Sequence, residues 1–494
     1  MAPIIQPNIL LITSDQQRYD TVGPNAPAFL RTPHFDRLCH EGVVFSSAYS
    51  DCPLCVPARV SIMTGKQVFN HGMAFNGETS KVLGHANTLP MYLRQLGYQT
   101  AAIGKMHFGP QRIRHGFDEM IIPEDYYKQM RQEGYNCQPM WHGMGQNEIY
   151  PTMATVPESK TLTAWIAEQC AEYILERRDP SVPFFLWCSF SKPHPPFDPP
   201  EPYYSMYRNC PIPEPIFGDW SEPDKAPSAF QRYQQLQSYD LIPLEIIKEA
   251  RAAYYGLITQ VDYNLGKVLG ALQDLKMLAE TLIIYTSDHG EYLGDHHTGA
   301  KGFFHESSAH IPLVVRLPQS WSKRCHGQTI TTPVTHADIL PTLVVAAGGN
   351  PPSDTDGMDL VALARGELKE NRQYLEAMMG NVTEWLGPVS ECDYLAITDG
   401  RWKYIWYPEG AVEQLFDLEN DPRELKDIAG LAENEGKLLE LKQELINRNK
   451  ARASKFIIDG KLITKPLRND QTVERRNQSW PGYHTDHFRV DVRH

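Results

Sequence analysis

The chain has 494 residues, of which 41% are hydrophobic and 22% are charged, and its formal net charge is -13 at pH 7. Since one hydrophobic core rarely serves a chain this long, we expect two domains, and the length excludes a small scaffold held together by disulfides. The negative charge argues against an extended basic face for nucleic acid or an anionic membrane.

The first residues form an apolar run that is broken early by Gln6, Pro7 and Asn8. The run has no positively charged leader, and the sequence has no stretch of about 20 apolar residues that would cross a bilayer. The nine cysteines are odd in number and scattered, a pattern typical of proteins from reducing compartments. These features predict a cytoplasmic protein that does not bind membranes.

Several apolar, strand-like runs end in polar residues that are capable of chemistry: residues 8–17, 99–108, 183–194 and 281–291. Runs of this length suit strands that are buried on both faces of a mainly parallel sheet. Helical patterns with turn signals at their ends lie between these runs, at residues 88–97, 160–178 and 243–275. The alternation predicts an α/β fold in which helices cover both faces of a large, mainly parallel sheet.

Ligands of open α/β sheets bind outside the carboxyl ends of the strands. The runs bring the following residues to those ends: Asp15, Lys105, His107, His194, Asp288 and His289. A single strand that ends in Asp is most often followed by a simple turn. Several coincident endings with complementary chemistry instead predict one active site.

The C-terminal part of the chain has a different pattern. Residues 392–408 are typical of a β-hairpin, residues 414–422 of a further strand and residues 431–452 of a helix. We therefore expect an α/β domain over residues 1–370 and a smaller α+β domain with an antiparallel sheet over residues 371–494. We expect the polar C-terminal tail to wrap the surface or a partner subunit.

Cys52 and Cys55 have the spacing of a redox pair or of half a zinc site. A zinc site needs a second pair at matched spacing, and a redox pair needs a small domain in which the cysteines open a helix; the sequence offers neither. Pro57 suits a first helical turn and Gly65 can end that helix, so Cys55 is predicted at a helix N-terminus, where the dipole favours negative charge. Arg59 follows one turn later, which groups a nucleophile with a fixed cation.

The segment CVPAR, followed by MTG, resembles the signature of the sulfatases, a family of the alkaline-phosphatase-like superfamily. Further motifs occur in the order that this family shows, and together they span most of the chain: PNILLITSDQ, TPHFDRL, GKMHF, KPHPPF, SDHGEYLGDHH and LFDLENDPRE. The resemblance implies that a formylglycine-generating maturation enzyme oxidises Cys55 to an aldehyde, which hydrates to a geminal diol. That diol is the nucleophile, and Cys52 is incidental.

The same resemblance implies a divalent cation held by strand-end carboxylates, by their neighbours and by the modified side chain: Asp15, Gln16, Cys55, Asp288 and His289. Many relatives have an Asp and an Asn where this chain has Gln16 and His289. Calcium is the cation that the family implies, but an imidazole ligand leaves manganese or magnesium open.

A sulfate ester carries dispersed negative charge and a poor leaving group, so its site needs cations, a nucleophile and a proton donor. By resemblance, Arg59 orients the diol, and His107 is the base that restores the aldehyde. The sulfate is held by Lys105, His194 and Lys301. The proton donor to the leaving group stays open between His194 and Lys301.

The predicted reaction is hydrolysis of a sulfate monoester to inorganic sulfate and an alcohol. A sulfated carbohydrate is the first hypothesis for the substrate, and a small aliphatic or aryl ester is the second. Asn76 is a candidate contact beside the sulfate. A homo-oligomer is a further expectation, because large enzymes commonly form one.

Two other functions stay open. A phosphonate monoester or phosphodiester hydrolase on the same scaffold is similar in several motifs, including Ala58 after the signature proline. Lys105 and His107 favour the sulfatase, because the phosphonate branch lacks this pair. An inactive, metal-binding homologue would keep an intact thiol at Cys55, but every expected catalytic position is filled, which favours an enzyme.

Overall fold

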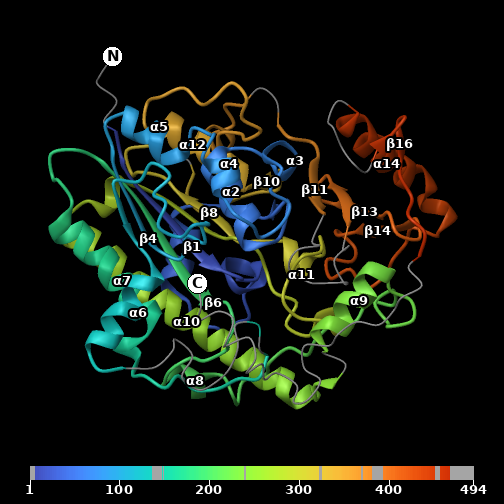
Figure 1. Cartoon of the computed structure of the whole chain (residues 1–494), viewed down its shortest axis with the longest axis horizontal. Coiled ribbons are helices and arrows are strands. Elements are labelled where there is room, and N and C mark those ends of the chain that lie inside the picture. Colours follow the sequence, from blue (N-terminus) through green and yellow to red (C-terminus); the bar gives the residue numbers. More distant parts are fainter. Residues whose placement is uncertain are drawn as a thin grey trace.

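The computed structural model describes residues 6–135, 147, 149–238, 241–321, 325–368, 371–380, 393–450 and 457–467. These residues form two main sheets that are surrounded by helices (Figure 1). The C-terminal tail beyond residue 467 lies outside the described residues, and so does the expectation that it wraps the surface.

The larger sheet has eight strands in the order β5-β4-β6-β1-β7-β8-β2-β9. Their bounds are β1 Asn8–Asp15, β2 Val43–Phe45, β4 Gln99–Gly104, β5 Glu119–Ile121, β6 Phe184–Pro193, β7 Thr281–Ser287, β8 Leu313–Arg316 and β9 Gln328–Ile330. Strand β8 runs antiparallel to β7 and β2, and the remaining pairings are parallel. The prediction of a mainly parallel sheet is confirmed, and its predicted strands are β1, β4, β6 and β7.

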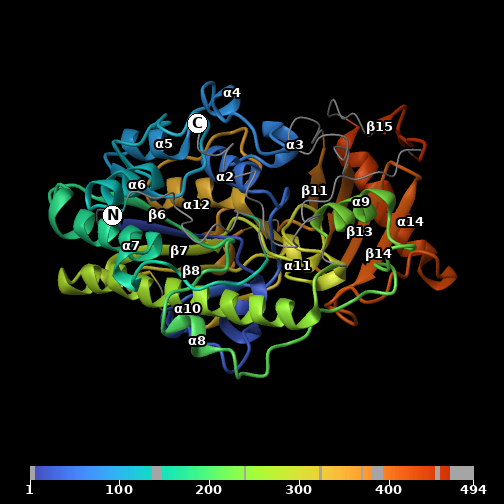
Figure 2. The ribbon, with the colours of Figure 1, turned by 60° about the horizontal axis from the view of Figure 1, so that its bottom comes forward.

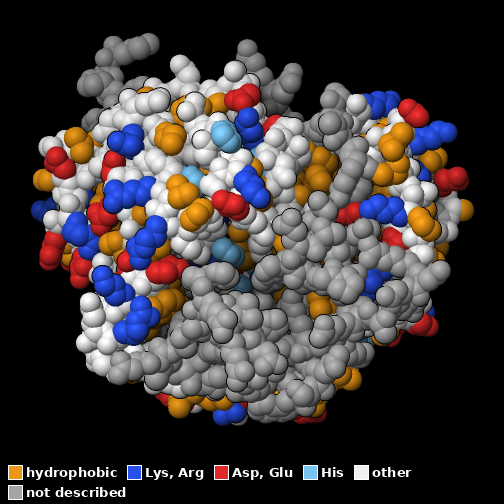
Figure 3. Space-filling model, viewed as in Figure 1, with side chains coloured by type: hydrophobic (Ala, Val, Ile, Leu, Met, Phe, Trp, Pro, Cys, Tyr) orange, Lys and Arg blue, Asp and Glu red, His pale blue; other side chains and the backbone are white. Residues whose placement is uncertain are grey.

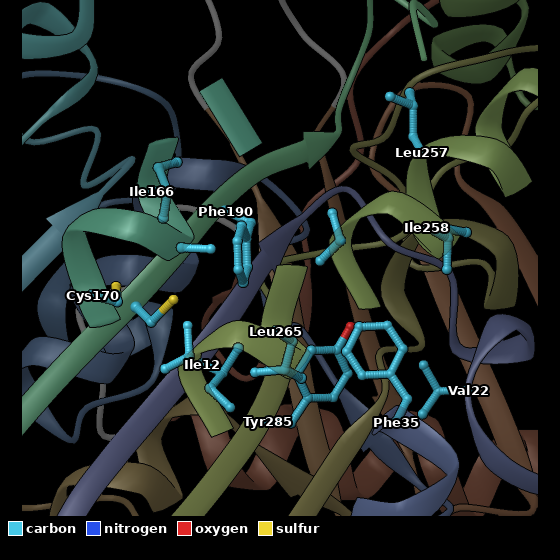
Figure 4. Packing of buried hydrophobic residues seen from close by; sticks show 14 of the residues in the cluster. Ile12, Val22, Phe35, Ile166, Cys170, Phe190, Leu257, Ile258, Leu265 and Tyr285 are labelled. Carbon is cyan, nitrogen blue, oxygen red and sulfur yellow. The ribbon is translucent and has the colours of Figure 1, made fainter. Parts of the chain in front are cut away.

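One face of this sheet packs on helices α7 (Leu162–Glu172) and α10 (Leu244–Asp274). Alternate residues of a strand point to the same face, and Leu10 and Ile12 of β1 enter the cluster on this side. Figure 4 shows Ile12 near Leu265 of α10, with Ile166 of α7 in the same cluster. Because these side chains are removed from water, the two helices are fixed against the sheet.

The opposite face receives Ile9 and Leu11, the other members of the alternation. The helices on this side include α2 (Cys55–Thr64), α5 (Leu89–Gln95) and α12 (Ile339–Ala346). Figure 2 shows the layers, with α2, α5 and α12 above the strands and α10 below them. The expectation that helices cover both faces is therefore confirmed.

Further, shorter elements occur along the chain. The helices are α1 Pro33–Glu41, α3 Val68–His71, α4 Ser80–Leu83, α6 Pro123–Gln132, α8 Tyr203–Met206, α9 Ser228–Gln237, α11 Glu306–Ala309 and α13 Leu360–Ala364. Two-residue strands pair outside the large sheets, namely β3 Ala48–Tyr49 with β10 Val334–Thr335, and β15 Ile457–Ile458 with β16 Lys461–Leu462.

The second sheet is antiparallel and has the order β11-β12-β13-β14. Its strands are β11 Leu375–Met379, β12 Tyr394–Thr398, β13 Trp402–Tyr407 and β14 Val412–Asp417. Helix α14 (Glu435–Asn449) covers one face, where Leu441 and Leu445 pack near Leu395 and Ile397. The predicted hairpin, strand and helix of the C-terminal part are confirmed, and the domain boundary at residue 370 stays a prediction.

The other face of the second sheet packs toward the larger part of the protein, where Ala377 and Ile405 join Tyr49 and Phe304 in one cluster. On the face shown in Figure 3, acidic and basic side chains are mixed with each other. Among the described residues, no helix has the length and apolar character that a membrane span requires.

Candidate active site

Polar residues gather at the carboxyl edge of four neighbouring strands, β4, β6, β1 and β7. Strand β1 ends at Asp15, and the chain continues from the other three strands directly into Lys105, His194 and Asp288. Because parallel strands end at the same edge, these residues come from distant parts of the sequence to one place. The convergence expected from the sequence is present in the fold.

Gly104 sets the direction of the chain at the end of β4. Its φ is +104°, and a Cβ at this position would lie 1.9 Å from the carbonyl oxygen of Ser189 on β6. Only glycine tolerates both the conformation and the close approach. The next residue, Lys105, donates its backbone N–H to the same carbonyl at 2.9 Å, so the lysine leaves the strand in a fixed direction.

Helix α2 begins at Cys55 and ends before Gly65, whose φ of +66° is left-handed. All ten residues of the helix are buried, and they include Arg59. The Arg59 guanidinium lies 3.3 Å from Asp15 Oδ2 and 3.1 Å from Asp288 Oδ2. The helix thereby joins its N-terminal cysteine to the two carboxylates at the sheet edge.

A group of possible metal ligands lies at this junction: Asp15, Cys55, Asp288 and His289. Each offers one ligand atom, and these atoms lie within 4.8 Å of one another. Asp15 Oδ1 is buried and has no hydrogen-bond partner among the described residues. An unpartnered carboxylate oxygen among further donor atoms suits a divalent cation, so the residues fit the implied metal.

Gln16 lies beside this group, with a left-handed φ of +67°. Its backbone N–H donates to Asp288 Oδ1 at 3.0 Å, and its side-chain Oε1 accepts from Lys301 Nζ at 2.5 Å. Cys52 has a different environment, because its thiol lies 3.6 Å from the carbonyl oxygen of Ala74. The structure thus groups Cys55 with the ligands and Cys52 with the backbone of a loop.

Two lysines bring positive charge to the group. Lys105 Nζ lies 2.6 Å from Asp15 Oδ2, and Lys301 Nζ lies 3.1 Å from His194 Nε2. The other ring nitrogen of His194, Nδ1, is 2.8 Å from the carbonyl oxygen of Pro195. A carbonyl only accepts, so Nδ1 carries the proton and Nε2 accepts from the Lys301 ammonium. Burial, together with Lys301 and Lys105, lowers the pKa of His194 well below its usual range, in agreement with a neutral ring.

The surroundings of position 55 favour negative charge. Burial and Asp15 oppose ionisation of the Cys55 thiol, but Lys301, Lys105 and His289 outweigh them and lower its pKa well below the usual range. Burial also opposes ionisation of Asp15, yet Lys105 and other cations lower the pKa of this carboxyl. Burial and the charge of Asp15 raise the pKa of Asp288. The site therefore stabilises an anion at Cys55 and Asp15.

A cavity of about 420 Å³ opens onto this group. Its lining contains the following predicted site residues: Cys55, Asn76, Lys105, His107, His194 and Lys301. His107 has a φ of +56°, and its Nδ1 is buried without a hydrogen-bond partner among the described residues. Asn76 Oδ1 accepts from the backbone N–H of Val56 at 2.9 Å. Arg59, Asp15, Gln16 and His289 each contact one of these lining residues, and Asp288 lies behind them against Arg59.

Two neighbours of the site were not predicted from the sequence. Ser189 Oγ accepts from Arg59 at 2.9 Å and donates to the carbonyl oxygen of Lys105 at 2.6 Å. Glu291 accepts a short hydrogen bond from Gln16 Nε2. A serine within a strand gives no signal of such a role, whereas Glu291 belongs to the SDHGE segment and follows His289 by two residues.

Comparisons with known proteins agree with this arrangement. A family model described as Sulfatase matches residues 7–349, and a model described as N-sulphoglucosamine sulphohydrolase, C-terminal, matches residues 294–451. The chain is 31% identical to an arylsulfatase of Clostridium perfringens, over 93% of this chain and 98% of the relative. It is 27% identical to an N-acetylglucosamine-6-O-sulfatase of Bacteroides thetaiotaomicron, over 89% of this chain and 86% of the relative.

A solved structure is similar over most of its length. The phosphonate monoester hydrolase of Agrobacterium radiobacter superposes with a TM-score of 0.76 and 27% sequence identity. The match covers 90% of this chain and 95% of that one. The two sheets described above therefore belong to a fold that both a sulfatase and a phosphonate hydrolase can use.

Proposed function

The chain belongs to the sulfatase family and is a hydrolase of sulfate esters, and from this premise we propose that Cys55 is the precursor of its nucleophile. One observation carries the proposal: Cys55 lies among Asp15, Asp288 and His289, beside an unpartnered carboxylate oxygen and at a cavity. We propose that oxidation of Cys55 gives formylglycine, whose hydrated form supplies the attacking hydroxyl. A maturation enzyme would carry out this oxidation.

Asp15, Gln16, Asp288 and His289 would hold a divalent cation together with the modified side chain 55. When bound, the cation would polarise the sulfate and favour ionisation of the attacking hydroxyl. Calcium is our first proposal, and the imidazole of His289 keeps manganese and magnesium as alternatives.

The residues around position 55 would stabilise the attacking oxygen in its ionised form. Two of the neighbours that lower the pKa of the Cys55 thiol, Lys301 and Lys105, would act on that oxygen. Arg59 would orient it from within α2, because its guanidinium is fixed by Asp15 and by Asp288. Preorganised charge of this kind is often the largest contribution to a rate enhancement.

Lys105, His194 and Lys301 would bind the sulfate oxygens from the cavity wall. We propose Lys301 as the proton donor to the leaving alcohol, because it donates a hydrogen bond to His194 and the His194 ring is neutral. His194 would orient that ammonium. His107 would be the base that restores the aldehyde, since its unpartnered Nδ1 is available for a proton.

A sulfated carbohydrate is our first proposal for the substrate, and the likeness to an N-acetylglucosamine-6-O-sulfatase supports it. A small aryl ester is second, supported by the likeness to an arylsulfatase. Asn76 would contact the substrate beside the sulfate. A cytoplasmic location, a homo-oligomer and the domain division at residue 370 also stay proposals, and they rest on the sequence.

The test has a chemical and a kinetic part. A mass spectrum of the peptide that spans Cys55, from protein purified from its natural source, should show the aldehyde or its hydrate. The same protein should release inorganic sulfate from at least one ester in a panel of sulfated sugars and aryl sulfates. An intact thiol together with no turnover on any ester would contradict the proposal.

Phosphonate monoester hydrolysis is the second candidate, because the phosphonate monoester hydrolase of Agrobacterium radiobacter shares the fold over 90% of this chain. Both reactions need the same stabilisation of negative charge, so a side activity is expected. A comparison of kcat/KM on an aryl sulfate and on the matched phenyl phosphonate distinguishes the two functions. A higher value for the sulfate supports the sulfatase, and a higher value for the phosphonate reverses the assignment.

A further inference from the structure

Gln16 is fixed at its backbone. Its N–H donates to Asp288 Oδ1 at 3.0 Å, and its carbonyl oxygen accepts from the hydroxyl of Tyr254 at 2.7 Å. The residue is completely buried, so its side chain has little room to move. The remaining question is which end of the side-chain amide faces Lys301, a residue that also lowers the pKa of the Cys55 thiol. The two ends have nearly the same shape and opposite polarity, because the oxygen accepts and the NH₂ group donates.

The Glu291 carboxylate determines the orientation of the Gln16 amide. Its Oε2 accepts from Gln16 Nε2, and a carboxylate can only accept hydrogen bonds. The NH₂ end of the Gln16 amide is therefore held toward Glu291. The oxygen end points the other way, toward Lys301 Nζ at 2.5 Å.

The Glu291 carboxylate is itself rigidly placed. The residue is 1% exposed, and its Oε1 accepts from the backbone N–H groups of Leu293 at 2.8 Å and Ala300 at 2.7 Å. Its own backbone N–H donates to the carbonyl oxygen of Ser307 at 2.8 Å, and its carbonyl oxygen accepts from Arg18 at 2.9 Å. The side chain therefore cannot follow the Gln16 amide if that amide turns over.

We propose that Glu291 is a positioning residue that keeps the Gln16 amide oxygen, and not the amide NH₂, directed at the cation. This inference rests on the proposed function, in which Gln16 is a ligand. Without the carboxylate, the amide can turn over and present its NH₂ group to the cation. Because that group carries partial positive charge, it repels the cation. The contact with Ala300 gives Glu291 a second role, since it fixes the backbone that leads into Lys301.

A purely structural role for Glu291 makes a different prediction. In that case the carboxylate only closes the loop between Glu291 and Ala300 through Oε1, and the bond from Gln16 has no consequence for ligands. Glu291→Gln separates the two roles, because a glutamine keeps one acceptor oxygen for the backbone N–H groups. Its NH₂ group then faces Gln16, whose amide must turn over.

The experiment measures the affinity of the full-length protein for Ca²⁺, Mn²⁺ and Mg²⁺ by isothermal titration calorimetry. Glu291→Gln should weaken binding of the preferred cation by about 10–100-fold, as found for other partners of metal ligands. The exchange variant, which combines Gln16→Glu with Glu291→Gln, should restore most of the lost affinity. The carboxylate introduced at position 16 can accept from the amide introduced at position 291 and still offer an oxygen to the cation.

The matched control is Glu424→Gln, which changes another buried glutamate that accepts from a backbone N–H and a side chain. It should leave the affinity unchanged, and the melting temperature of each cation-free variant reports whether it folds. Unchanged affinity in Glu291→Gln would overturn the inference and leave the proposed function standing. A loss that the exchange variant does not restore would also overturn it. Wild-type protein that binds none of the three cations would instead overturn the metal-dependent function itself.

Discussion

Two clusters of buried charge among the described residues differ in how completely neighbouring side chains satisfy them. The first, which we call the site cluster, comprises Asp15, Arg59, Lys105 and Asp288 at the carboxyl edge of the eight-stranded sheet. Asp15 Oδ1 has no hydrogen-bond partner among the described residues, and the Lys105 side chain keeps 19% of its surface exposed. The hydrogen-bonding capacity of this cluster is thus incompletely satisfied, and the cluster adjoins a cavity.

The second, which we call the paired cluster, comprises Glu306 of α11, Lys403 of β13 and Glu424 beyond β14. Helix α11 lies between the two sheets, so the cluster links them (Figure 1). The Lys403 ammonium is fully buried, 2.6 Å from Glu306 Oε1 and 2.8 Å from Glu424 Oε1. Buried charged groups whose atoms are all paired in this way maintain the fold, whereas a charged group with an unpartnered atom beside a cavity can bind a ligand. The difference predicts that substitutions in one cluster affect activity and those in the other affect stability.

The largest expected effect is the loss of the nucleophile beside the site cluster. Cys55→Ala should lower kcat by about four orders of magnitude or more, since it removes the reacting group itself. The measurement is turnover of the best ester in the panel, with the melting temperature as the test of folding. Cys52→Ala is the matched control, because this thiol is also buried but lies 3.6 Å from the carbonyl oxygen of Ala74 and is not part of the group of possible metal ligands. Cys52→Ala should keep most of the activity. If Cys55→Ala still hydrolysed the ester, Cys55 would not be the precursor of the nucleophile.

The paired cluster should show the opposite behaviour. Lys403→Met leaves Glu306 and Glu424 without their cation, and removal of one partner from a buried charge network costs about 3–5 kcal/mol of unfolding free energy. Urea denaturation measures this loss. At low temperature, where the variant is still folded, kcat should stay within a few-fold of wild type. A large loss of kcat with unchanged stability would show that the two clusters are not separate.

The sequence predicted the site cluster better than the paired cluster, and the reason lies in the topology. Asp15, Lys105 and Asp288 stand at the ends of long apolar runs, and parallel strands must end at one edge. Lys403 and Glu306 lie in separate short elements, β13 and α11. Their contact depends on how the second sheet packs on the first, which no local pattern encodes.

The same limit applies within the fold and the site. The long strands and helices have clear periodicity, whereas β2, β5 and β9 have three residues each, too few for a pattern to emerge. Gln16 was assigned from the sequence by family resemblance, but its bond to Glu291 joins residues 275 positions apart. Such partners depend on side-chain geometry that only the folded chain defines.

A smaller loss of activity is expected for a substitution of Lys105 in the site cluster. Lys105→Ala should lower kcat by about 10²–10³-fold, the range for removing one preorganised donor to developing charge. Its effect on stability should be smaller than that of Lys403→Met, because Arg59 still neutralises Asp15. Steady-state kinetics measures kcat, and urea denaturation measures the unfolding free energy. Lys66→Ala, a surface lysine paired with Asp354, is the control and should change neither. Sulfate cleavage that survives Lys105→Ala would remove this lysine from the proposed mechanism.

The smallest expected effect concerns the pH dependence of the paired cluster. Burial raises the pKa of Glu424, and repulsion by Glu306 adds to this although Lys403 opposes it. Burial also disfavours the charged form of Glu306, but Lys403 and His310 lower its pKa. The cluster therefore holds one ion pair and a second carboxyl that resists ionisation. The two glutamates have the same covalent structure, so the opposite shifts of their pKa values come from their surroundings alone.

The sign of the pH effect follows from the raised pKa of Glu424. A carboxyl whose pKa is higher in the folded state contributes stability below its unfolded value near 4.5, and this contribution is lost as pH rises through the folded value. Glu424→Gln keeps the acceptor and cannot ionise, so its unfolding free energy relative to wild type should rise by about 1–3 kcal/mol between pH 5 and pH 8. Urea denaturation at both pH values measures the difference. If the difference between the two proteins is the same at both, Glu424 ionises as freely in the folded state as in the unfolded chain. The paired cluster would then carry two negative charges against the single cation of Lys403, and the contrast between the two regions would rest on the cavity and on the unpartnered oxygen of Asp15.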